Sequence, residues 1–184
     1  MKRLLLMTLV FCCVACGSDT DKMIYATKGG EFGSQQGNFV ADFPTKPKYT
    51  LLERQSGTES YEVHTFRSTL GPNKIFTLEY IDYPESTISL FTNEEIYDLS
   101  IQNYASQVIE NFVLDSQKPI EQHGLKGQYF VLNLNQAALD KGIKGHIEGS
   151  IFRSGNRVYT ISYTGRLDKN VDTFMESFRI LNQN

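Results

Sequence analysis

The chain has 184 residues, of which 40% are hydrophobic and 21% charged, a composition typical of one compact globular domain. Its formal net charge is −3, and without Lys2 and Arg3 at the start the remaining residues carry a charge of −5. This acidic balance argues against a surface that binds nucleic-acid phosphates. After the first 16 residues no apolar run reaches the roughly 18 residues of a membrane-spanning helix, so a multi-pass membrane protein does not fit.

The first residues are typical of a bacterial export leader. Met1–Arg3 is a basic start, and Leu4–Ala15 is a twelve-residue apolar stretch, too short to cross about 30 Å of hydrocarbon. Val14–Ser18 resembles a bacterial lipobox, although Cys13 stands where that motif usually has Leu. The resemblance implies cleavage after Ala15 and acylation of Cys16. The alternative is an ordinary secretory signal, cut at the same place, that leaves Cys16 as a free thiol.

The cysteine distribution favours the lipid. All three cysteines lie within residues 1–16, so the rest of the chain has no disulfide although the expected compartment is oxidising. Because one acyl chain binds only marginally, two or three chains on Cys16 would give a stable anchor. We therefore predict a lipid-anchored protein of the bacterial cell envelope. Gly17 after the lipidated Cys resembles the outer-membrane sorting pattern, and Ser18–Asp21 resembles an acidic surface-export signal of Bacteroidetes lipoproteins.

The sequence predicts three segments: a signal peptide over 1–15, the lipidated Cys with a flexible tether over 16–37, and a folded domain over 38–184. The tether is rich in Gly, Ser, Asp and Gln, and a segment with so little apolar surface does not offset the entropy of ordering. As a coil of about 21 residues it would reach roughly 25 Å. A solvated linker without any export signal is the alternative.

The first half of the domain is predicted to be mainly strands. Phe39–Pro44 alternates apolar residues and stops at a proline, which favours an edge strand. Gly57 and Gly71-Pro72 mark turns between the strands that follow, and strands this closely spaced should pair antiparallel. The following strands are predicted at 49–54, 61–67 and 74–83.

A helix is predicted over 93–113. Thr92 is its expected N-cap, Glu95 completes a capping box, and Phe91 and Ile96 form a hydrophobic staple. Its apolar residues recur at helical spacing and form one stripe that would lie on the sheet. They are Tyr97, Ile101, Tyr104, Ala105, Val108 and Phe112.

The second half is predicted to contain strands at 114–122, 128–135, 147–153 and 157–163 and a helix over 169–178. Pro119 places the first of these strands at a sheet edge, and Gly155-Asn156 suits a tight hairpin turn. Asp168 is the expected cap of the last helix. The fold class is therefore α+β, with a central antiparallel sheet and helices packed on it.

Five short stretches resemble landmarks of PsbP-like domains, a superfamily that includes a photosystem II subunit, a Ran-binding import factor and the bacterial DcrB-like envelope proteins. The resemblance implies an α/β/α sandwich and a binding or assembly module rather than an enzyme, and it transfers no partner. The stretches are Phe39–Pro47, Phe76–Pro84, His123–Phe130, Gly155–Tyr159 and Phe174–Phe178.

The residues that could carry chemistry form no strong motif. His64, His123 and His146 lack zinc-site spacing, although His146 and Glu148 could share one face of a strand. No nucleophile elbow, P-loop or dinucleotide motif occurs, so no catalytic residue, metal ligand or cofactor is predicted. A Ser-His-Asp triad assembled only in space stays open as a less favoured alternative.

Aromatic side chains offer one possible binding patch. Most of the ten tyrosines and twelve phenylalanines fall on predicted core stripes. Those that could be exposed and bind a ligand are Tyr80, Tyr83, Tyr129, Tyr159 and Tyr163.

The sequence thus predicts an envelope lipoprotein held at the membrane through Cys16, with a non-catalytic PsbP-like domain that binds an envelope protein or a small ligand. A closed aromatic cavity would favour a ligand carrier, whereas a large exposed apolar patch would favour an assembly protein. A hydrolase would need polar side chains with shifted pKa values that converge in a cleft.

Overall fold

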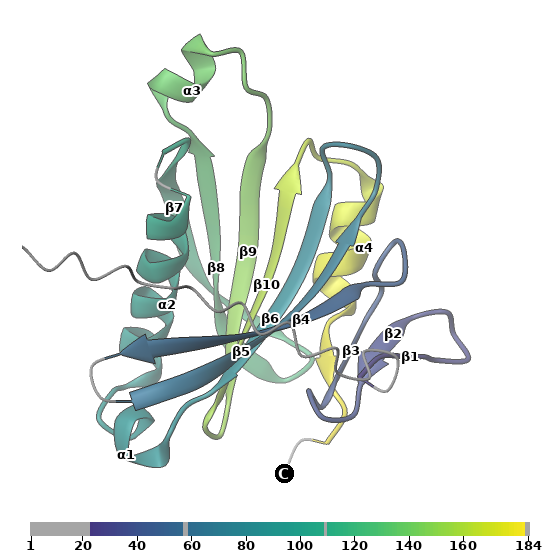
Figure 1. Ribbon diagram of the computed structural model, residues 1–184, viewed down its shortest axis with the longest axis vertical. Helices are drawn as coiled ribbons and strands as arrows, with labels where there is room; N and C mark the ends of the chain where they lie inside the picture. Colours follow the sequence, from purple (N-terminus) through teal and green to yellow (C-terminus); the bar gives the residue numbers. More distant parts are fainter. Residues whose placement is uncertain (1–22, 57–58, 109, 183–184) are drawn as a thin grey trace, which may run out of the picture.

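A computed structural model of the protein describes residues 23–56, 59–108 and 110–182. These residues form a twisted seven-stranded sheet, a smaller four-stranded sheet and four helices (Figure 1). Both sheets are antiparallel throughout. The α+β class and the central antiparallel sheet are therefore confirmed. No helix of the described residues is long and apolar enough to cross a bilayer.

The large sheet contains all the strands predicted at and after residue 49. Its two halves join where β6 pairs with β10, with Tyr80 opposite Tyr159. The predicted hairpin turn between β9 and β10 is confirmed, and Gly155 adopts the left-handed φ of 59° that the turn requires. In spatial order the strands are β4 (Lys48–Ser56), β5 (Glu59–Thr69), β6 (Ile75–Asp82), β10 (Arg157–Gly165), β9 (His146–Ser154), β8 (Leu125–Leu134) and β7 (Phe112–Gln122).

The two edges of the large sheet differ. As predicted, β7 lies at an edge, where it contains Pro119 and a register shift between Leu114 and Ser116. Such interruptions discourage a further strand from pairing. The opposite edge strand, β4, pairs with β5 without a register shift.

The small sheet corrects two predictions. It consists of β1 (Tyr25–Ala26), β2 (Phe32–Ser34), β3 (Phe39–Ala41) and β11 (Arg179–Ile180), in that order. β3 pairs on both sides, so the edge position expected for Phe39–Pro44 is wrong: Pro44 follows the strand and interrupts no pairing. Residues 24–37, expected to belong to the tether, contain two strands and the buried Ile24.

Four helices complete the described fold. They are α1 (Glu85–Ile88), α2 (Asn93–Gln107), α3 (Gln136–Asp140) and α4 (Lys169–Ser177). The capping box of α2 is present, since Glu95 N donates to Thr92 Oγ1 at 3.3 Å and Thr92 N donates to Glu95 Oε2 at 2.8 Å. α2 ends earlier than residue 113 because Phe112 already starts β7, opposite Leu134. Asp168 caps α4, as expected.

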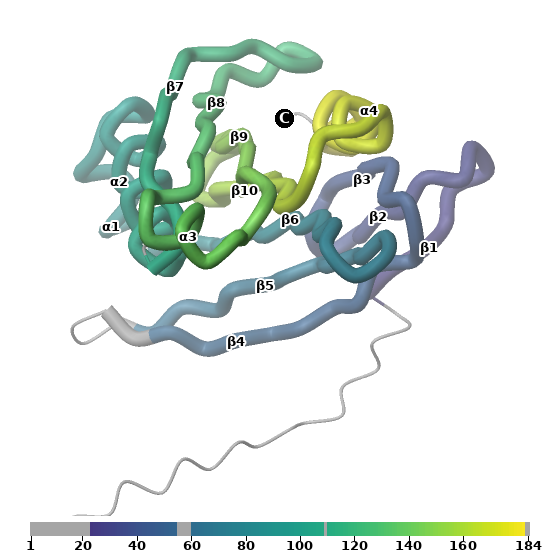
Figure 2. Tube along the Cα trace, turned by 90° about the horizontal axis from the view of Figure 1, so that it is seen from above, coloured from purple at the N-terminus to yellow at the C-terminus, as the bar shows by residue number. Residues whose placement is uncertain are grey.

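The elements form layers around the large sheet (Figure 2). α2 packs on β7, β8 and β9 on one face, and α4 and the small sheet cover the other face. The second face is strongly aromatic: Phe39, Phe66, Phe76, Phe152 and Phe178 are buried there. These rings supply the core of a chain that contains no tryptophan.

Candidate functional site

A cleft separates α2 from strands β5 and β6, on the face of the large sheet that α2 covers in part. Its volume is about 330 Å³. Side chains alternate between the two faces of a strand, so β5 contributes Tyr61 and Val63 to this face, and β6 contributes Glu79 and Ile81. The helix presents Ser100, Asn103, Tyr104 and Gln107 to the same space.

Tyr61, Tyr83 and Tyr104 belong to the lining of the cleft. The rings of Tyr61 and Tyr83 lie 5.7 Å apart and are tilted by 38°. Tyr104 packs against Phe130 and donates its hydroxyl to Ser162 Oγ at 3.0 Å. Burial raises the pKa of Tyr83 and of Tyr104, so both hydroxyls stay protonated near neutral pH. The cleft therefore offers aromatic surface together with polar ends.

Polar groups stand at the rim and on the wall of the cleft. Arg54 Nη2 donates to Gln107 Oε1 at 3.2 Å, which connects β4 to α2. Glu79 Oε1 accepts from Thr65 Oγ1 at 3.0 Å. A ligand in this space would meet a cation, a carboxylate and aromatic rings within one open cleft.

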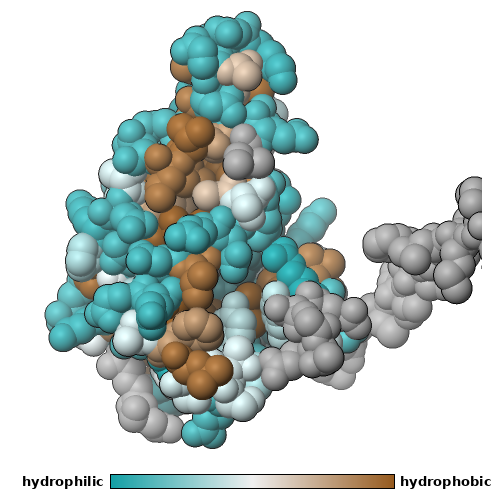
Figure 3. All heavy atoms as spheres, turned by 90° about the vertical axis from the view of Figure 1, so that its left-hand side faces the viewer, coloured by the Kyte–Doolittle hydropathy of each residue, from teal (hydrophilic) through white to brown (hydrophobic). Residues whose placement is uncertain are grey.

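A smaller apolar pocket of about 140 Å³ adjoins the cleft. The two share Tyr83, Ser100 and Asn103 in their linings. Ile88 and Leu99 belong to the apolar part. Figure 3 shows hydrophobic residues in a broken column down this side of the molecule, separated by polar ones. The cleft is thus polar at one end and apolar at the other.

On the opposite face, three neighbouring strands hold a stack of His64, Tyr80 and Arg157. The His64 and Tyr80 rings are nearly parallel, with centroids 4.3 Å apart, and Arg157 Cζ lies 4.3 Å from the centre of the Tyr80 ring. Arg157 also donates to both carboxylate oxygens of Asp82 and to the carbonyl of Gln36. The guanidinium thus connects the large sheet to the turn between β2 and β3.

His64 is buried within this stack. Its Nδ1 lies 2.9 Å from the Tyr49 hydroxyl, and its Nε2 lies 3.4 Å from Glu62 Oε2. Burial lowers the pKa of the imidazole, against the opposing effect of Glu62. A hollow of about 320 Å³ beside it is lined by Glu53, Glu62 and Asp82. Across the described residues, however, no group of three His, Cys, Asp or Glu side chains is placed to hold a metal ion.

The other histidines lie in unrelated places. His123 Nε2 is 3.0 Å from the carbonyl oxygen of Glu176, and His146 meets the ring of Tyr163 edge-on. Glu148, expected to share a face with His146, accepts a hydrogen bond of 2.6 Å from the Tyr129 hydroxyl. The structure therefore does not bring the three histidines together.

The aromatic residues named from the sequence divide into two groups. Tyr80, Tyr159 and Tyr163 are fully buried core residues. Tyr83 lines the cleft, and Tyr129 lines a separate hollow of about 480 Å³ beside α4. Cys16, the predicted lipidation site, lies outside the described residues.

Sequence reasoning did not identify the cleft. The apolar stripe predicted to pack on the sheet includes Tyr104, whereas Asn103 lies outside that stripe. Tyr61 and Arg54 lie on strands that carried no binding motif. The capping box does fix where α2 begins, but the exposed part of the sheet beside the helix depends on the width and twist of the sheet.

The fold is similar to that of a solved PsbP structure. The solution structure of cyanobacterial PsbP (CyanoP) from Synechocystis sp. PCC 6803 matches with a TM-score of 0.53, over 90% of this chain and 97% of that one. The sequences are 11% identical, so the likeness concerns the fold alone. No family model and no curated protein matches the chain.

Proposed function

We propose that this protein is a lipid-anchored component of the bacterial cell envelope whose PsbP-like domain is a non-catalytic binding module. Gly17, directly after the predicted lipidated Cys16, supports a location at the outer membrane. The cleft between α2 and the strands β5 and β6 carries the proposal. It combines aromatic rings, a cation and hydrogen-bonding groups in a space that is open to solvent. Such a mixture of apolar and polar groups is typical of a recognition site.

The shape of the cleft favours one kind of binding. An open cleft does not enclose a small ligand as a carrier does, whereas it accepts a group that projects from a larger molecule. Its apolar end suits a hydrocarbon side chain, and the polar end suits a ring or chain with hydrogen-bonding groups. We therefore infer that the partner is an envelope component that presents a short amphipathic segment. The anchor would raise the local concentration of a modest binding site.

The anchor itself is tested at Cys16. We expect Cys16→Ser to abolish incorporation of a fatty-acid analogue and to release the protein from membranes. Labelling that persists in this variant would refute the lipidation site. A mature amino terminus with a bare thiol would instead support the ordinary secretory signal.

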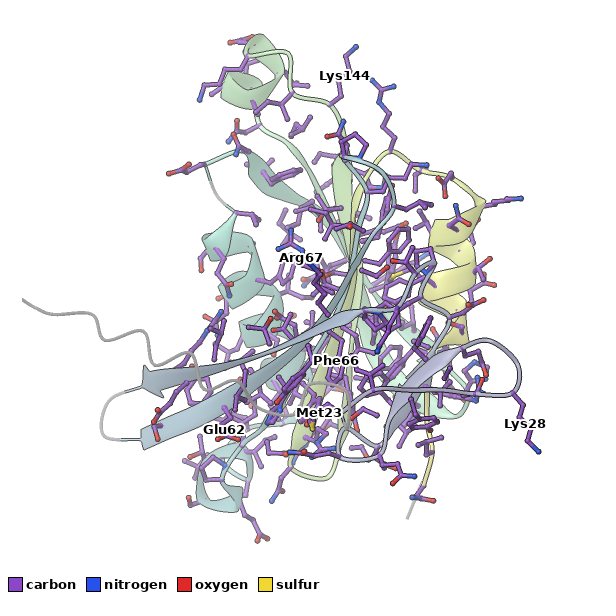
Figure 4. The ribbon with its side chains drawn as sticks, turned by 45° about the vertical axis from the view of Figure 1, so that its right-hand side comes forward. Met23, Lys28, Glu62, Phe66, Arg67 and Lys144 are labelled. Atoms are coloured by element: carbon purple, nitrogen blue, oxygen red, sulfur yellow. The ribbon has the colours of Figure 1, made fainter. Side chains whose placement is uncertain are left out.

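The cleft is tested by photocrosslinking in intact cells. A photoreactive amino acid at Asn103, an exposed residue of the cleft lining, should give a discrete crosslinked product. The same amino acid at Lys28 is the control, because that residue is exposed in the turn between β1 and β2, far from α2 (Figure 4). Crosslinks at both sites, or at neither, would contradict the cleft as the binding site. Adding Tyr83→Ala should weaken the product obtained at position 103.

A further inference from the structure

Three connections meet at the end of the large sheet that includes α3 (Figure 1). They are the β5–β6 turn, the loop from α3 to β9 and the loop from β10 to α4. Together they surround a hollow of about 570 Å³ that includes Leu70, Asn73, Lys74, Ile143, Lys144 and Arg166 in its lining. We call this end of the molecule the basic tip.

The basic tip concentrates positive charge in a chain whose overall charge is negative. Lys74, Lys144 and Arg166 line the hollow, and its lining contains no carboxylate. Of the two acidic residues nearby in the sequence, Asp168 pairs with Lys74 and caps α4, and Asp140 accepts from Gln136 at 2.8 Å. Figure 4 shows Lys144 pointing outward from this end. The hollow therefore suits an anionic group.

Helix α3 and the same loops expose large apolar side chains. Leu167 is 65% exposed, Leu139 is 51% exposed and Ile143 is 37% exposed. Leu167 follows Arg166 directly, and Ile143 precedes Lys144. A free anion in the hollow would be bound by the cations and would leave Leu139 and Leu167, which lie outside its lining, exposed to water. Their alternation with lysine and arginine is the pattern of a surface that rests in the headgroup region of a membrane.

The loops are held in place by contacts within the fold. The ion pair of Lys74 with Asp168 connects the β5–β6 turn to the start of α4. The Tyr163 hydroxyl donates to the carbonyl of Arg166, and Ile143 N donates to the carbonyl of Ala138 at 3.1 Å. The cationic and apolar groups are thus presented together at one end of the molecule.

We propose that the basic tip docks on an anionic bilayer surface. Lipid phosphates would occupy the hollow beside Lys144 and Arg166, and Leu139, Ile143 and Leu167 would enter the boundary between headgroups and acyl chains. The contact is independent of the cleft and of acylation at Cys16. With an anchor present, it would act as the second attachment that fixes the orientation of the domain at the membrane.

The absence of tryptophan from the chain gives a site-specific test. Residues 17–184 contain every described helix and strand and lack the predicted acylation site, so this fragment reports on the tip alone. Leu167→Trp introduces the only indole. We expect its emission to shift to the blue, and brominated lipids to quench it, on vesicles of phosphatidylcholine with phosphatidylglycerol. Vesicles of phosphatidylcholine alone should have little effect.

Two matched controls accompany the test. Leu90→Trp places the indole at an apolar residue that is 75% exposed in the α1–α2 connection, at the opposite end of the molecule (Figure 1), and its emission should not change. In the Leu167→Trp background, Lys144→Glu with Arg166→Glu should weaken vesicle binding at least tenfold. Lys28→Glu with Lys118→Glu makes the same charge change elsewhere and should have a smaller effect.

Several results would overturn the proposal. They are no response of Leu167→Trp to anionic vesicles, an equal response at position 90, and equal losses from the two charge reversals. Binding of inorganic phosphate at the tip without any vesicle response would identify an anion site instead. Far-ultraviolet circular dichroism and thermal melting of each variant establish that the variants compared are folded.

Discussion

Two buried tyrosines that face each other across β6 and β10 should respond in opposite ways to loss of their hydroxyl groups. Tyr80 is 0% exposed and Tyr159 is 1% exposed. Tyr159 donates its hydroxyl to the carbonyl of Gly37 at 2.8 Å. The Tyr80 hydroxyl has no hydrogen-bond partner within the described residues. Burial also raises the pKa of Tyr80, so its hydroxyl is buried in the neutral form.

The expected magnitudes follow from the energetics of buried polar groups. A buried donor without a partner costs about 1–3 kcal/mol, whereas a typical hydrogen bond contributes about 1 kcal/mol. Tyr80→Phe should therefore raise the free energy of unfolding by about 1 kcal/mol or more, and Tyr159→Phe should lower it by about 1 kcal/mol or more. For a domain of about 150–250 residues, 1 kcal/mol corresponds to a change of roughly 2–4 °C in the melting temperature.

Urea denaturation of the two variants and the wild type measures this difference directly. The denaturant slope should be the same in all three, because the surface exposed on unfolding hardly changes. A Tyr80→Phe protein that loses as much stability as Tyr159→Phe would refute the reasoning. It would mean that the Tyr80 hydroxyl forms a hydrogen bond in the folded protein.

Three further predictions concern other positions in the large sheet. Burial holds the pKa of His64 below its usual 6.5, so the unfolded chain binds a proton that the folded chain does not. The free energy of unfolding should therefore fall as the pH drops below about 6.5. His64→Gln should flatten this pH dependence, as measured by urea titrations at several pH values. Arg157→Ala removes the contacts with Asp82, Gln36 and Tyr80 and should lower the free energy of unfolding by about 2 kcal/mol. The control Arg166→Ala, at an exposed residue, should lower it by less than about 0.5 kcal/mol. Equal decreases in the melting temperature of the two variants would contradict a stabilising role for Arg157. Gly149→Ala would place a Cβ 2.4 Å from the Phe130 ring and 2.9 Å from the Ile161 carbonyl oxygen. The variant should therefore melt at a temperature well below that of the wild type. An unchanged melting temperature would show that β9 and its neighbours move apart easily at Gly149.

Local patterns in the sequence predicted most of the large sheet and both long helices. The alternation around Phe76, Leu78 and Tyr80 marks β6, whose residues at these positions are all buried. The Thr92–Glu95 capping box fixes the start of α2, and Asp168 fixes the start of α4. These signals involve residues a few positions apart, so they do not depend on the rest of the fold.

Apart from the strand predicted at Phe39–Pro44, the small sheet was not predictable in this way. β1 and β11 have two residues each, too few for an alternating pattern, and their partners come from other segments. Gly33 and Gly37 suggested a flexible tether, but both are close-packing positions. A Cβ at Gly33 would lie 2.8 Å from the Phe39 carbonyl oxygen, and one at Gly37 would lie 2.7 Å from the Phe39 ring. Contacts of this kind appear only in three dimensions.

The candidate site depends on the same long-range information. Tyr61 lies on β5 and Tyr104 lies on α2, and no sequence motif connects them. They line one cleft only because α2 packs on β7, β8 and β9 and leaves part of β5 and β6 uncovered. The basic tip likewise draws Lys74, Lys144 and Arg166 from three separate connections. The residue types in the sequence predict neither the cleft nor the basic tip, because each of these surfaces forms only when distant segments come together in the fold.

The pairing of β11 with β3 affects when the protein can fold. Phe39 and Val40 find their partners in Ile180 and Arg179, which the ribosome adds about 140 residues later. A growing chain therefore lacks one side of its small sheet until synthesis has passed residue 180. Late completion of the small sheet delays folding, which is compatible with the export that the proposed envelope location requires.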